Sequence, residues 1–317
     1  MDDKELAIAF SEDVKILKKE IAKVIVGQDE TVDGIITSIF CNGHALLIGV
    51  PGLAKTLLIN TLSTALELSF NRIQFTPDLM PGDITGTEVL GQDRSFKFVK
   101  GSIFSNIILA DEINRTPPKT QAALLEAMQE KNVTYGGQSY PLPDPFFVLA
   151  TQNPIEQEGT YPLPEAQLDR FMFNLILDYP NFREELDILK QTTGGKVAKP
   201  NKVLGVDKII EYQNLVKRVP VTDHVYEYIV SLVHKTRPNR DGTHDYINKY
   251  VTYGAGPRAG QNLVMAAKCL ALTKGKFSPD IIDVKEVAKN VLRHRLVRNY
   301  KAEAEEITSD QIIEQIL

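Results

Sequence analysis

The residues with the clearest chemical meaning form the segment GVPGLAKT at positions 49–56, directly after the apolar run 45–48. An apolar run, a glycine-containing loop and then apolar residues at helical spacing predict a strand, a loop and a helix start. The backbone N–H groups of such a loop and the positive end of its helix can enclose a phosphate. Lys55 would reach the β- and γ-phosphates, and Thr56 would offer its hydroxyl to Mg²⁺. The residues expected to contact the nucleotide here are Gly49, Pro51, Gly52, Leu53, Ala54, Lys55, Thr56 and Leu57.

Position 54 departs from the usual phosphate-loop pattern, because Ala54 stands where a second glycine is normal. A Cβ atom excludes most backbone conformations with positive φ. We therefore predict an ordinary backbone conformation at Ala54. The alternative for the whole segment is a plain strand–turn–helix connection without a ligand.

Two further apolar strands end in polar residues that could complete a nucleotide site. Residues 107–112 end in Asp111 and Glu112, and residues 145–153 end in Asn153. In a phosphate-loop enzyme such an aspartate holds Mg²⁺ and such a glutamate polarises the attacking water. The carboxyl ends of parallel strands face the nucleotide, although an acidic turn or an asparagine turn cap would also explain these residues.

The coarse order of elements predicts a three-layer α/β domain. Helical stripes at 5–25 and 29–40 flank Gly27 and Gln28, where a backbone turn could touch a base or could simply join two helices. Alternating apolar strands and helices predict a parallel five-stranded sheet. The expected strands are 45–48, 70–75, 107–112, 145–153 and 171–177, with a loop at 76–83, hairpins at 84–100 and 133–140, and a short helix at 162–171.

A boundary is predicted at residues 179–181, which gives an α/β domain at 1–180 and an all-α domain at 181–317. Apolar stripes at helical spacing continue throughout the second part. Pro257 suits the first turn of a helix, so Arg258 could project from a helix N-terminus. The basic stretch 293–298 falls on the last long helix, where a solvated face is the ordinary interpretation.

Composition is that of an ordinary globular protein and excludes several classes. The 317 residues are 43% hydrophobic and 24% charged, and the net charge of −5 gives no global attraction for nucleic acid or anionic membrane. Two cysteines and five histidines show no spacing typical of a disulfide framework or a metal cluster. No apolar stretch approaches the ~18 residues of a membrane span, so we expect a cytoplasmic protein.

Taken in this order, the motifs resemble those of the MoxR family of AAA+ ATPases over nearly the whole chain. The phosphate loop with alanine before the lysine resembles that family's version of the Walker A loop. The other stretches that carry the resemblance are FTPDL at 75–79, ADEINR at 110–115, ATQNP at 150–154, LPEAQLDRF at 163–171, GPRA at 256–259 and VLRHRL at 291–296.

The resemblance implies roles that spacing alone does not assign. It places Asn153 at the sensor 1 position, Arg170 at the arginine finger and Arg258 at the sensor 2 arginine. It also implies a P-loop AAA+ domain followed by a helical lid, with ATP and Mg²⁺ as cofactors and two inserted hairpins. Similar proteins form rings, usually hexamers, and act with von Willebrand factor A-domain proteins on protein clients. Whether Arg258 acts on its own nucleotide or on a neighbour's stays open.

Two other functions remain as alternatives. Relatives of the family use similar hairpins on DNA, which suggests a nucleic-acid motor or loader. The hairpins carry few cations, the chain is acidic, and no aromatic–basic interleaving typical of single-strand binding is present. A small-molecule kinase is disfavoured by the Asp-Glu pair and the helical second half. The cations of the hairpins are Arg94, Lys97, Lys100 and Lys131.

Overall fold

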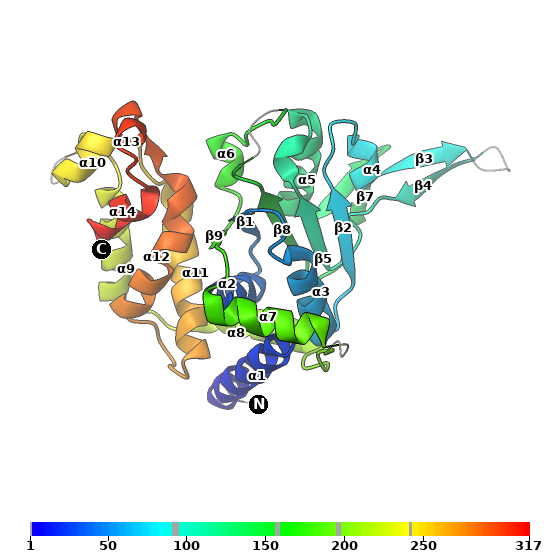
Figure 1. Ribbon diagram of the computed structural model, residues 1–317, viewed down its shortest axis with the longest axis horizontal. Helices are drawn as coiled ribbons and strands as arrows, with labels where there is room; N and C mark the ends of the chain where they lie inside the picture. Colours follow the sequence, from blue (N-terminus) through cyan, green and yellow to red (C-terminus); the bar gives the residue numbers. More distant parts are fainter. Residues whose placement is uncertain (1, 91–94, 156–158, 195–197, 241–242) are drawn as a thin grey trace.

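The computed structural model describes residues 2–90, 95–155, 159–194, 198–240 and 243–317. Figure 1 shows a central α/β unit, with two hairpins projecting on one side and a helical lid on the other. In the described part of the chain, no helix has the length and apolar character needed to cross a membrane.

The central sheet has five parallel strands in the order β2-β5-β8-β1-β9, which confirms the predicted sheet. Because every neighbouring pair is parallel, all carboxyl ends lie at one edge and all amino ends at the opposite edge. The register pairs Ala110 with Ala150 and Ala45 with Phe173. The strands are β1 (Ala45–Gly49), β2 (Phe70–Gln74), β5 (Ile107–Asp111), β8 (Phe147–Gln152) and β9 (Phe173–Leu177).

Adjacent residues of the central strands bury their side chains in two different cores. Leu47 packs into a core with helices α1 (Asp3–Ala22), α2 (Asp29–Phe40) and α3 (Lys55–Ala65). Leu46 packs on the other face, in a core with α5 (Pro118–Glu130). This alternation is expected for strands covered on both faces, and it gives the predicted three layers.

Two predicted segments differ from the structure because of prolines. The expected loop at 76–83 contains the start of helix α4 (Pro81–Thr85), in which Pro81 occupies the first helical turn and Asp83 accepts a hydrogen bond from Met80 N at 2.9 Å. The expected helix at 162–171 is reduced to α6 (Glu165–Leu168). Pro164 is the residue before this helix, and a proline disfavours the helical conformation at the residue that precedes it, so the helix does not start at residue 162.

The two predicted hairpins are present and contact each other. One joins β3 (Gly86–Leu90) to β4 (Phe96–Lys100), and its expected turn at 91–94 lies outside the described residues. The other joins β6 (Asn132–Tyr135) to β7 (Gln138–Pro141). The Phe98 ring stacks on the Tyr140 ring with centroids 4.1 Å apart, so the hairpins share an aromatic joint.

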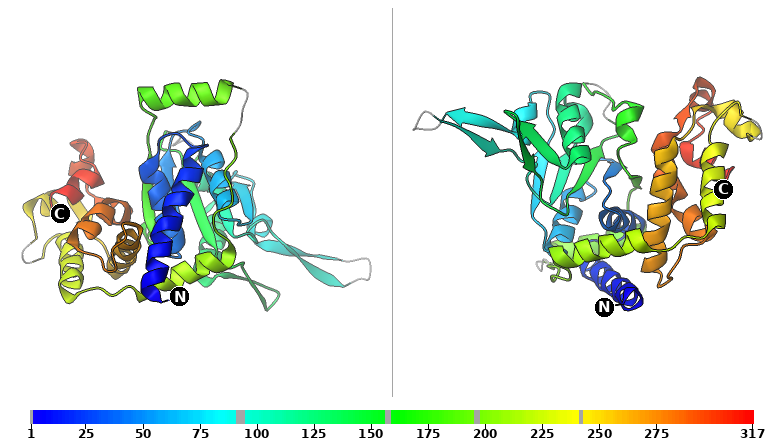
Figure 2. Two further views of the ribbon diagram at one scale, coloured as in Figure 1. Left: turned by 90° about the horizontal axis from the view of Figure 1, so that it is seen from below. Right: turned by 180° about the vertical axis from the view of Figure 1, so that it is seen from behind.

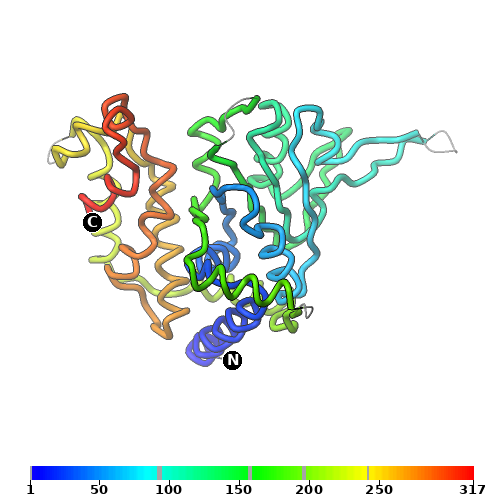
Figure 3. The backbone as a smooth tube through the Cα atoms, in the orientation of Figure 1, coloured from blue at the N-terminus to red at the C-terminus, as the bar shows by residue number. Residues whose placement is uncertain are grey.

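The chain runs from β9 through α7 (Phe182–Thr193) and α8 (Val206–Arg218) before it enters the lid (Figure 3). Helix α7 stands apart from the other helices on the outside of the molecule (Figure 2), and none of its residues is buried. Helix α8 packs against α2 as part of the first core, and there Gln213 Nε2 donates to Ile39 O at 2.8 Å. The division at residue 180 stays a prediction.

The lid is largely helical, with one small exception. Strands β10 (Val251–Tyr253) and β11 (Val297–Arg298) form an antiparallel pair, where we expected helices throughout. Strands this short carry no detectable alternation of apolar and polar residues. The helices of the lid are α9 (Asp223–Lys235), α10 (Asp245–Tyr250), α11 (Pro257–Thr273), α12 (Ile281–Leu292), α13 (Tyr300–Ala304) and α14 (Ser309–Glu314).

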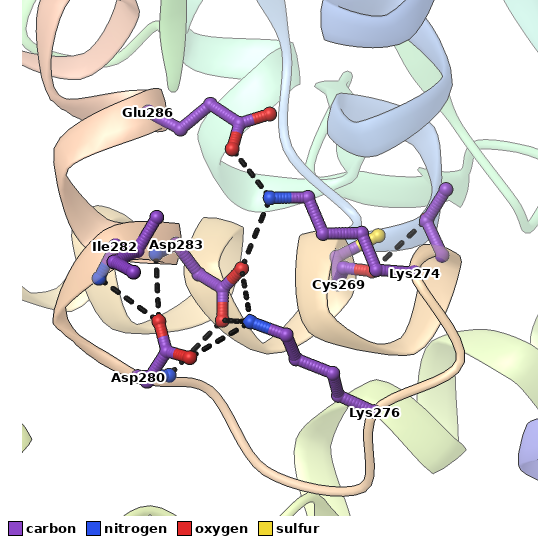
Figure 4. A network of polar contacts seen from close by, with 8 residues as sticks. Cys269, Lys274, Lys276, Asp280, Ile282, Asp283 and Glu286 are labelled. Atoms are coloured by element: carbon purple, nitrogen blue, oxygen red, sulfur yellow. Dashed lines mark hydrogen bonds and ion pairs between the residues drawn. The ribbon is translucent and has the colours of Figure 1, made fainter.

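A polar network fixes the connection between α11 and α12 (Figure 4). The carboxylate of Asp283 is fully buried and pairs with Lys274 at 3.2 Å and Lys276 at 3.0 Å. Asp280 caps α12 by accepting from the backbone of Ile282 at 2.9 Å, and its hydrogen bond from Lys276 lowers the pKa of Asp280 to about 2. Because a buried charge is costly unless it is paired, these two lysines offset the burial of the Asp283 carboxylate.

Candidate active site

The phosphate loop joins the carboxyl end of β1 to the start of α3 and is mostly exposed. Gly52 has a φ of +87°, and a Cβ atom there would meet open space, so the glycine is needed for its backbone conformation alone. Our expectation for Ala54 was wrong, because it adopts a left-handed conformation with φ 54° and ψ 26°. Such a conformation costs an alanine ~1–2 kcal/mol. The surrounding loop holds Ala54 in it despite this cost.

The N-terminus of α3 is open for an anion. Ala54 has no side chain that could cap the helix, so the cap residue offers no side-chain acceptor to the first N–H groups of α3. Lys55 is half-buried and its ammonium donates to Gly49 O. Burial lowers the pKa of Lys55, and the nearby carboxylates of Asp111 and Glu112 oppose this effect. The exposed side chain of Thr56 follows in the same turn.

The carboxylates predicted to act with this loop lie at the same edge of the sheet. Asp111 is the last residue of β5, and its Oδ1 accepts a hydrogen bond from Thr151 Oγ1 at 2.7 Å. The same hydroxyl accepts the backbone N–H of Glu112 at 2.9 Å. Thr151 thus fixes the positions of both acidic residues, and it was missed in the sequence. Its position could have been inferred from the pairing of β5 with β8. Ala110 pairs with Ala150, so the next residues, Asp111 and Thr151, lie side by side.

Glu112 leaves the sheet with a left-handed backbone, φ 56° and ψ 51°. Its Oε2 accepts from Gln74 Nε2 and from Arg115 Nη1, both at 3.0 Å. Arg72 Nη2 lies 2.6 Å from the other oxygen of Asp111, Oδ2. Gln74 and Arg72 were not found from the sequence, because they lie on β2, which pairs with β5 only in the folded sheet.

Asn153 follows β8 at the same edge and is buried. Its Oδ1 accepts from Ile155 N at 3.1 Å, so it caps the turn that leaves the strand. This is the alternative that a lone asparagine at a strand end favours. Asn153 nevertheless lies two residues after Thr151, at the edge that carries Asp111. Its sensor 1 role stays a prediction.

The junction of α1 and α2 lies against the phosphate loop. Gly27 and Gln28 have positive φ values of 69° and 61°, and Gln28 Nε2 donates to Leu53 O at 3.4 Å. Within the described residues, Gln28 Oε1 is buried without a hydrogen-bond partner. A Cβ atom at Gly27 would lie 2.7 Å from the Glu184 carboxyl carbon, so the Glu184 side chain of α7 reaches this turn.

These residues fit a magnesium nucleotide. The open N-terminus of α3, the left-handed loop and the half-buried ammonium of Lys55 suit a phosphate chain. A carboxylate at Asp111 and a hydroxyl at Thr56 are hard oxygen ligands of the kind that Mg²⁺ prefers. Among the described residues, no group of three acidic, histidine or cysteine side chains could hold a metal alone. Phosphate oxygens would therefore have to supply further ligands.

Arg170 and Arg258 lie at the opposite edge of the sheet. Arg170 precedes β9 and donates to Leu125 O at 2.7 Å, and Arg258 Nη1 lies 3.2 Å from Asp169 Oδ2. Both arginines line a hollow of about 310 Å³ together with His44, which directly precedes β1. Because β1 has five residues, its first and last Cα atoms are separated by roughly 13 Å at ~3.3 Å per residue. The structure thus brings these two arginines together, away from Lys55.

The basic stretch 293–298 is not a solvated face of a helix. Helix α12 ends at Leu292, and residues Arg293–Arg295 form a 3-10 turn. His294 and Arg295 are buried against the segment that carries Arg170. The basic pattern was misinterpreted because His294 and Arg295 have partners more than a hundred residues away.

The fold and the site define a P-loop ATPase of the AAA+ class. The model of ATPases associated with various cellular activities matches residues 44–173, which contain the phosphate loop, Asp111, Glu112, Asn153 and Arg170. A second model, the AAA lid domain, matches residues 245–316.

Similar proteins identify the family. Chaperone MoxR1 of Mycobacterium tuberculosis is 44% identical over 300 residues, covering 94% of this chain and 79% of that protein. Uncharacterized protein YeaC of Bacillus subtilis is 41% identical, covering 98% of this chain and 96% of that protein. The crystal structure of a candidate ATPase from Cytophaga hutchinsonii has a TM-score of 0.91 and 44% identity, covering 98% of this chain and 95% of that one. The chain belongs to the MoxR family of AAA+ ATPases.

Proposed function

We propose that this protein binds ATP with Mg²⁺ and hydrolyses it at sites shared between neighbouring copies of a hexameric ring. Lys55 binds the β- and γ-phosphates, and Thr56 and Asp111 hold Mg²⁺, which neutralises charge on the phosphate oxygens. Glu112 accepts a proton from the attacking water, and Asn153 orients that water. Gly27 and Gln28 contact the base. Hydrolysis drives the remodelling or maturation of protein complexes.

The observation that carries this proposal is the placement of the cations at two edges of one sheet. Lys55 lies at the carboxyl edge, whereas Arg170 and Arg258 line one hollow at the amino edge. An arginine that stabilises the transferred phosphoryl group is worth ~10³–10⁵ in rate. Since neither arginine lies at the edge of its own phosphate loop, we assign both to the nucleotide of the next copy. Under this proposal, Arg258 acts on the nucleotide of the neighbouring subunit and not on that of its own subunit.

Helix α7 supports assembly with further copies. It has no buried residue, yet it exposes Phe182 at 82%, Leu189 at 55% and Leu186 at 43%. Apolar side chains at this spacing form one face of an amphipathic helix. An exposed apolar face of this kind, next to the turn at Gly27, favours contact with another subunit. Ring size stays a prediction.

The hairpins are the proposed contact with protein clients. Leu90 and Phe96 at the outer end of the first hairpin are 62% and 69% exposed, and the aromatic joint ties this hairpin to the second one. Exposed apolar side chains suit unfolded or partly assembled protein better than nucleic acid. The chaperone name belongs to the mycobacterial relative and is consistent with such clients. A von Willebrand factor A-domain partner and a cytoplasmic location stay predictions.

Mixing two inactive variants tests the shared site. Lys55→Ala removes the phosphate-binding ammonium but leaves Arg170 available to a neighbour, and Arg170→Ala does the reverse. We expect each variant alone to be inactive and an equal mixture to regain about a quarter of the wild-type rate, since about one interface in four then has both parts. Failure of all mixing ratios to regain activity would contradict the proposal.

A further inference from the structure

Arg295 of the lid holds the backbone on both sides of Arg170. Its Nε lies 2.6 Å from Asp169 Oδ1, and its Nη2 donates to Asp169 O at 3.1 Å and to Phe171 O at 2.7 Å. Its Nη1 donates to Met172 O at 3.2 Å. The Arg295 side chain is only 2% exposed. A buried guanidinium with this many acceptors fixes the geometry of the peptide groups around it.

The two residues before Arg295 also bind carbonyl groups of the segment that carries Arg170. His294 Nε2 lies 3.1 Å from Phe171 O, and burial, reinforced by Arg295, holds the pKa of His294 well below its usual value. A neutral His294 with its proton on Nε2 therefore donates to that carbonyl. Arg293 donates to Asn174 O and is itself fixed by Asp310, with contacts of 2.7 and 2.8 Å. The carbonyls of residues 169, 171, 172 and 174 are thus all bound by the lid.

Arg170 lies inside this arrangement, and its backbone N–H donates to Gln167 O at 3.2 Å. Its side chain makes one contact with the α/β unit, among the contacts that the described residues show. That contact is the hydrogen bond from Nη1 to Leu125 O at 2.7 Å. Arg258, also on the lid, pairs with the second oxygen of Asp169 at 3.2 Å. The peptide groups on both sides of Arg170 are therefore bound by the lid, while Met172 N, which donates to His44 O at 2.7 Å, ties the same segment to the α/β unit.

We propose that Arg293, His294 and Arg295 are positioning residues for Arg170, so that the packing of the lid against residues 169–174 fixes where Arg170 of that subunit is held. This inference rests on the proposed function, in which Arg170 serves the nucleotide of the neighbouring copy. A change in lid orientation then moves Arg170 relative to the neighbour's phosphate. A displacement of about 1 Å at such a group can lower the rate by ~10²-fold. Small motions of the lid are therefore enough to control hydrolysis at the nucleotide of the neighbouring subunit.

The test is a complementation experiment with Arg295→Gln in the full chain. Alone, this variant should bind ATP with wild-type affinity and show a kcat lower by ~10²-fold. Mixed with Lys55→Ala, which has a correctly held Arg170, it should regain activity. Mixed with Arg170→Ala, it should regain none, because neither subunit offers a positioned arginine. A merely structural role would not place Arg295 and Arg170 in one complementation group.

Arg298→Gln is the matched control. Arg298 lies three residues further on and donates to Ile307 O at 2.9 Å within the lid. Its loss should leave kcat within about twofold of wild type. If Arg295→Gln does not fold, Arg295→Lys and Arg293→Gln replace it, and both should give smaller losses of kcat in the same complementation group.

Three results would overturn the inference. They are a wild-type kcat for the Arg295 and Arg293 variants, regained activity in the mixture with Arg170→Ala, and no regained activity in the mixture with Lys55→Ala. A different result would show that the proposed function itself is wrong. In that case Arg170→Ala and Lys55→Ala would not complement each other at all.

Discussion

The hydroxyl of Thr151, on the central strand β8, donates to Asp111 Oδ1 at 2.7 Å and so joins β8 to the last residue of β5. Thr151 is fully buried and also accepts the N–H of Glu112. Thr151→Val keeps the shape of the side chain but removes both hydrogen bonds. We expect the free energy of unfolding to fall by ~1–3 kcal/mol, as for unpaired buried polar groups, and kcat to fall at least ~10-fold.

Thr151→Ser is the control for this substitution, since serine keeps the hydroxyl and loses only a methyl group. It should retain most of the activity. Denaturant unfolding and steady-state ATP hydrolysis of the two variants measure both effects. Equal kcat values for Thr151→Val and Thr151→Ser would show that the bridge to Asp111 has no part in the reaction.

Glu112→Gln should separate binding from hydrolysis. The amide cannot accept a proton from water, so we expect turnover at least ~10²-fold slower with unchanged ATP affinity. Glu126→Gln, on the exposed side of α5, should have no effect and serves as the matched control. An unchanged turnover number in the Glu112 variant would remove this residue from catalysis. Proteins that co-purify with the trapped variant would identify clients.

Ala54→Gly tests the strain in the phosphate loop. At φ 54° glycine has no steric penalty, so relief of strain should outweigh the greater freedom of the unfolded chain and stabilise the protein by up to ~1 kcal/mol. Ala65→Gly, at the end of the same helix, should instead destabilise by ~1 kcal/mol or more. Thermal unfolding without nucleotide measures both. A loss of stability in Ala54→Gly would mean that the left-handed conformation carries no strain.

His44 should make the protein acid-sensitive. Burial is the main cause that lowers the pKa of His44 to about 4, and its ring bridges Met128 O at 3.3 Å and Val148 N at 3.1 Å. Because the folded protein holds the neutral ring, the stabilisation is present above the unfolded pKa of about 6.5 and is lost as pH falls toward 4. Between pH 7 and pH 5 this residue should cost about 2 kcal/mol of unfolding free energy.

The variant His44→Gln can accept from Val148 N and donate to Met128 O without titrating. Its unfolding free energy should depend less on pH than that of the wild type between pH 7 and pH 5. Urea unfolding at the two pH values gives the difference directly. Parallel pH profiles for the two proteins would show that His44 is not responsible for acid sensitivity.

The sequence predicted the parts of this molecule that are encoded locally. Lys55, Thr56, Asp111 and Glu112 follow apolar strands directly, so a strand and its last residues are visible together. The sheet and its three layers follow from the same alternation of strands and helices. For this reason the carboxyl edge of the sheet could be assembled before the structure was known.

What the sequence did not predict depends on contacts between distant segments. Gln74 meets Glu112 because β2 pairs with β5, and Arg295 meets Asp169 across 126 residues of chain. The left-handed conformation of Ala54 is imposed by the loop between β1 and α3 and contradicts the residue's own preference. Local patterns contain no information on such pairings, so the cations at 293–295 were mistaken for a solvated surface.

The central claim is that two copies of the chain form each hydrolytic site. The most direct measurement is ATP hydrolysis per subunit as a function of protein concentration, with light scattering on the same samples in the presence and absence of ATP and Mg²⁺. The account predicts that activity per subunit falls to near zero as the ring dissociates and rises with assembly. Full activity per subunit in a sample that is monomeric by scattering would contradict it.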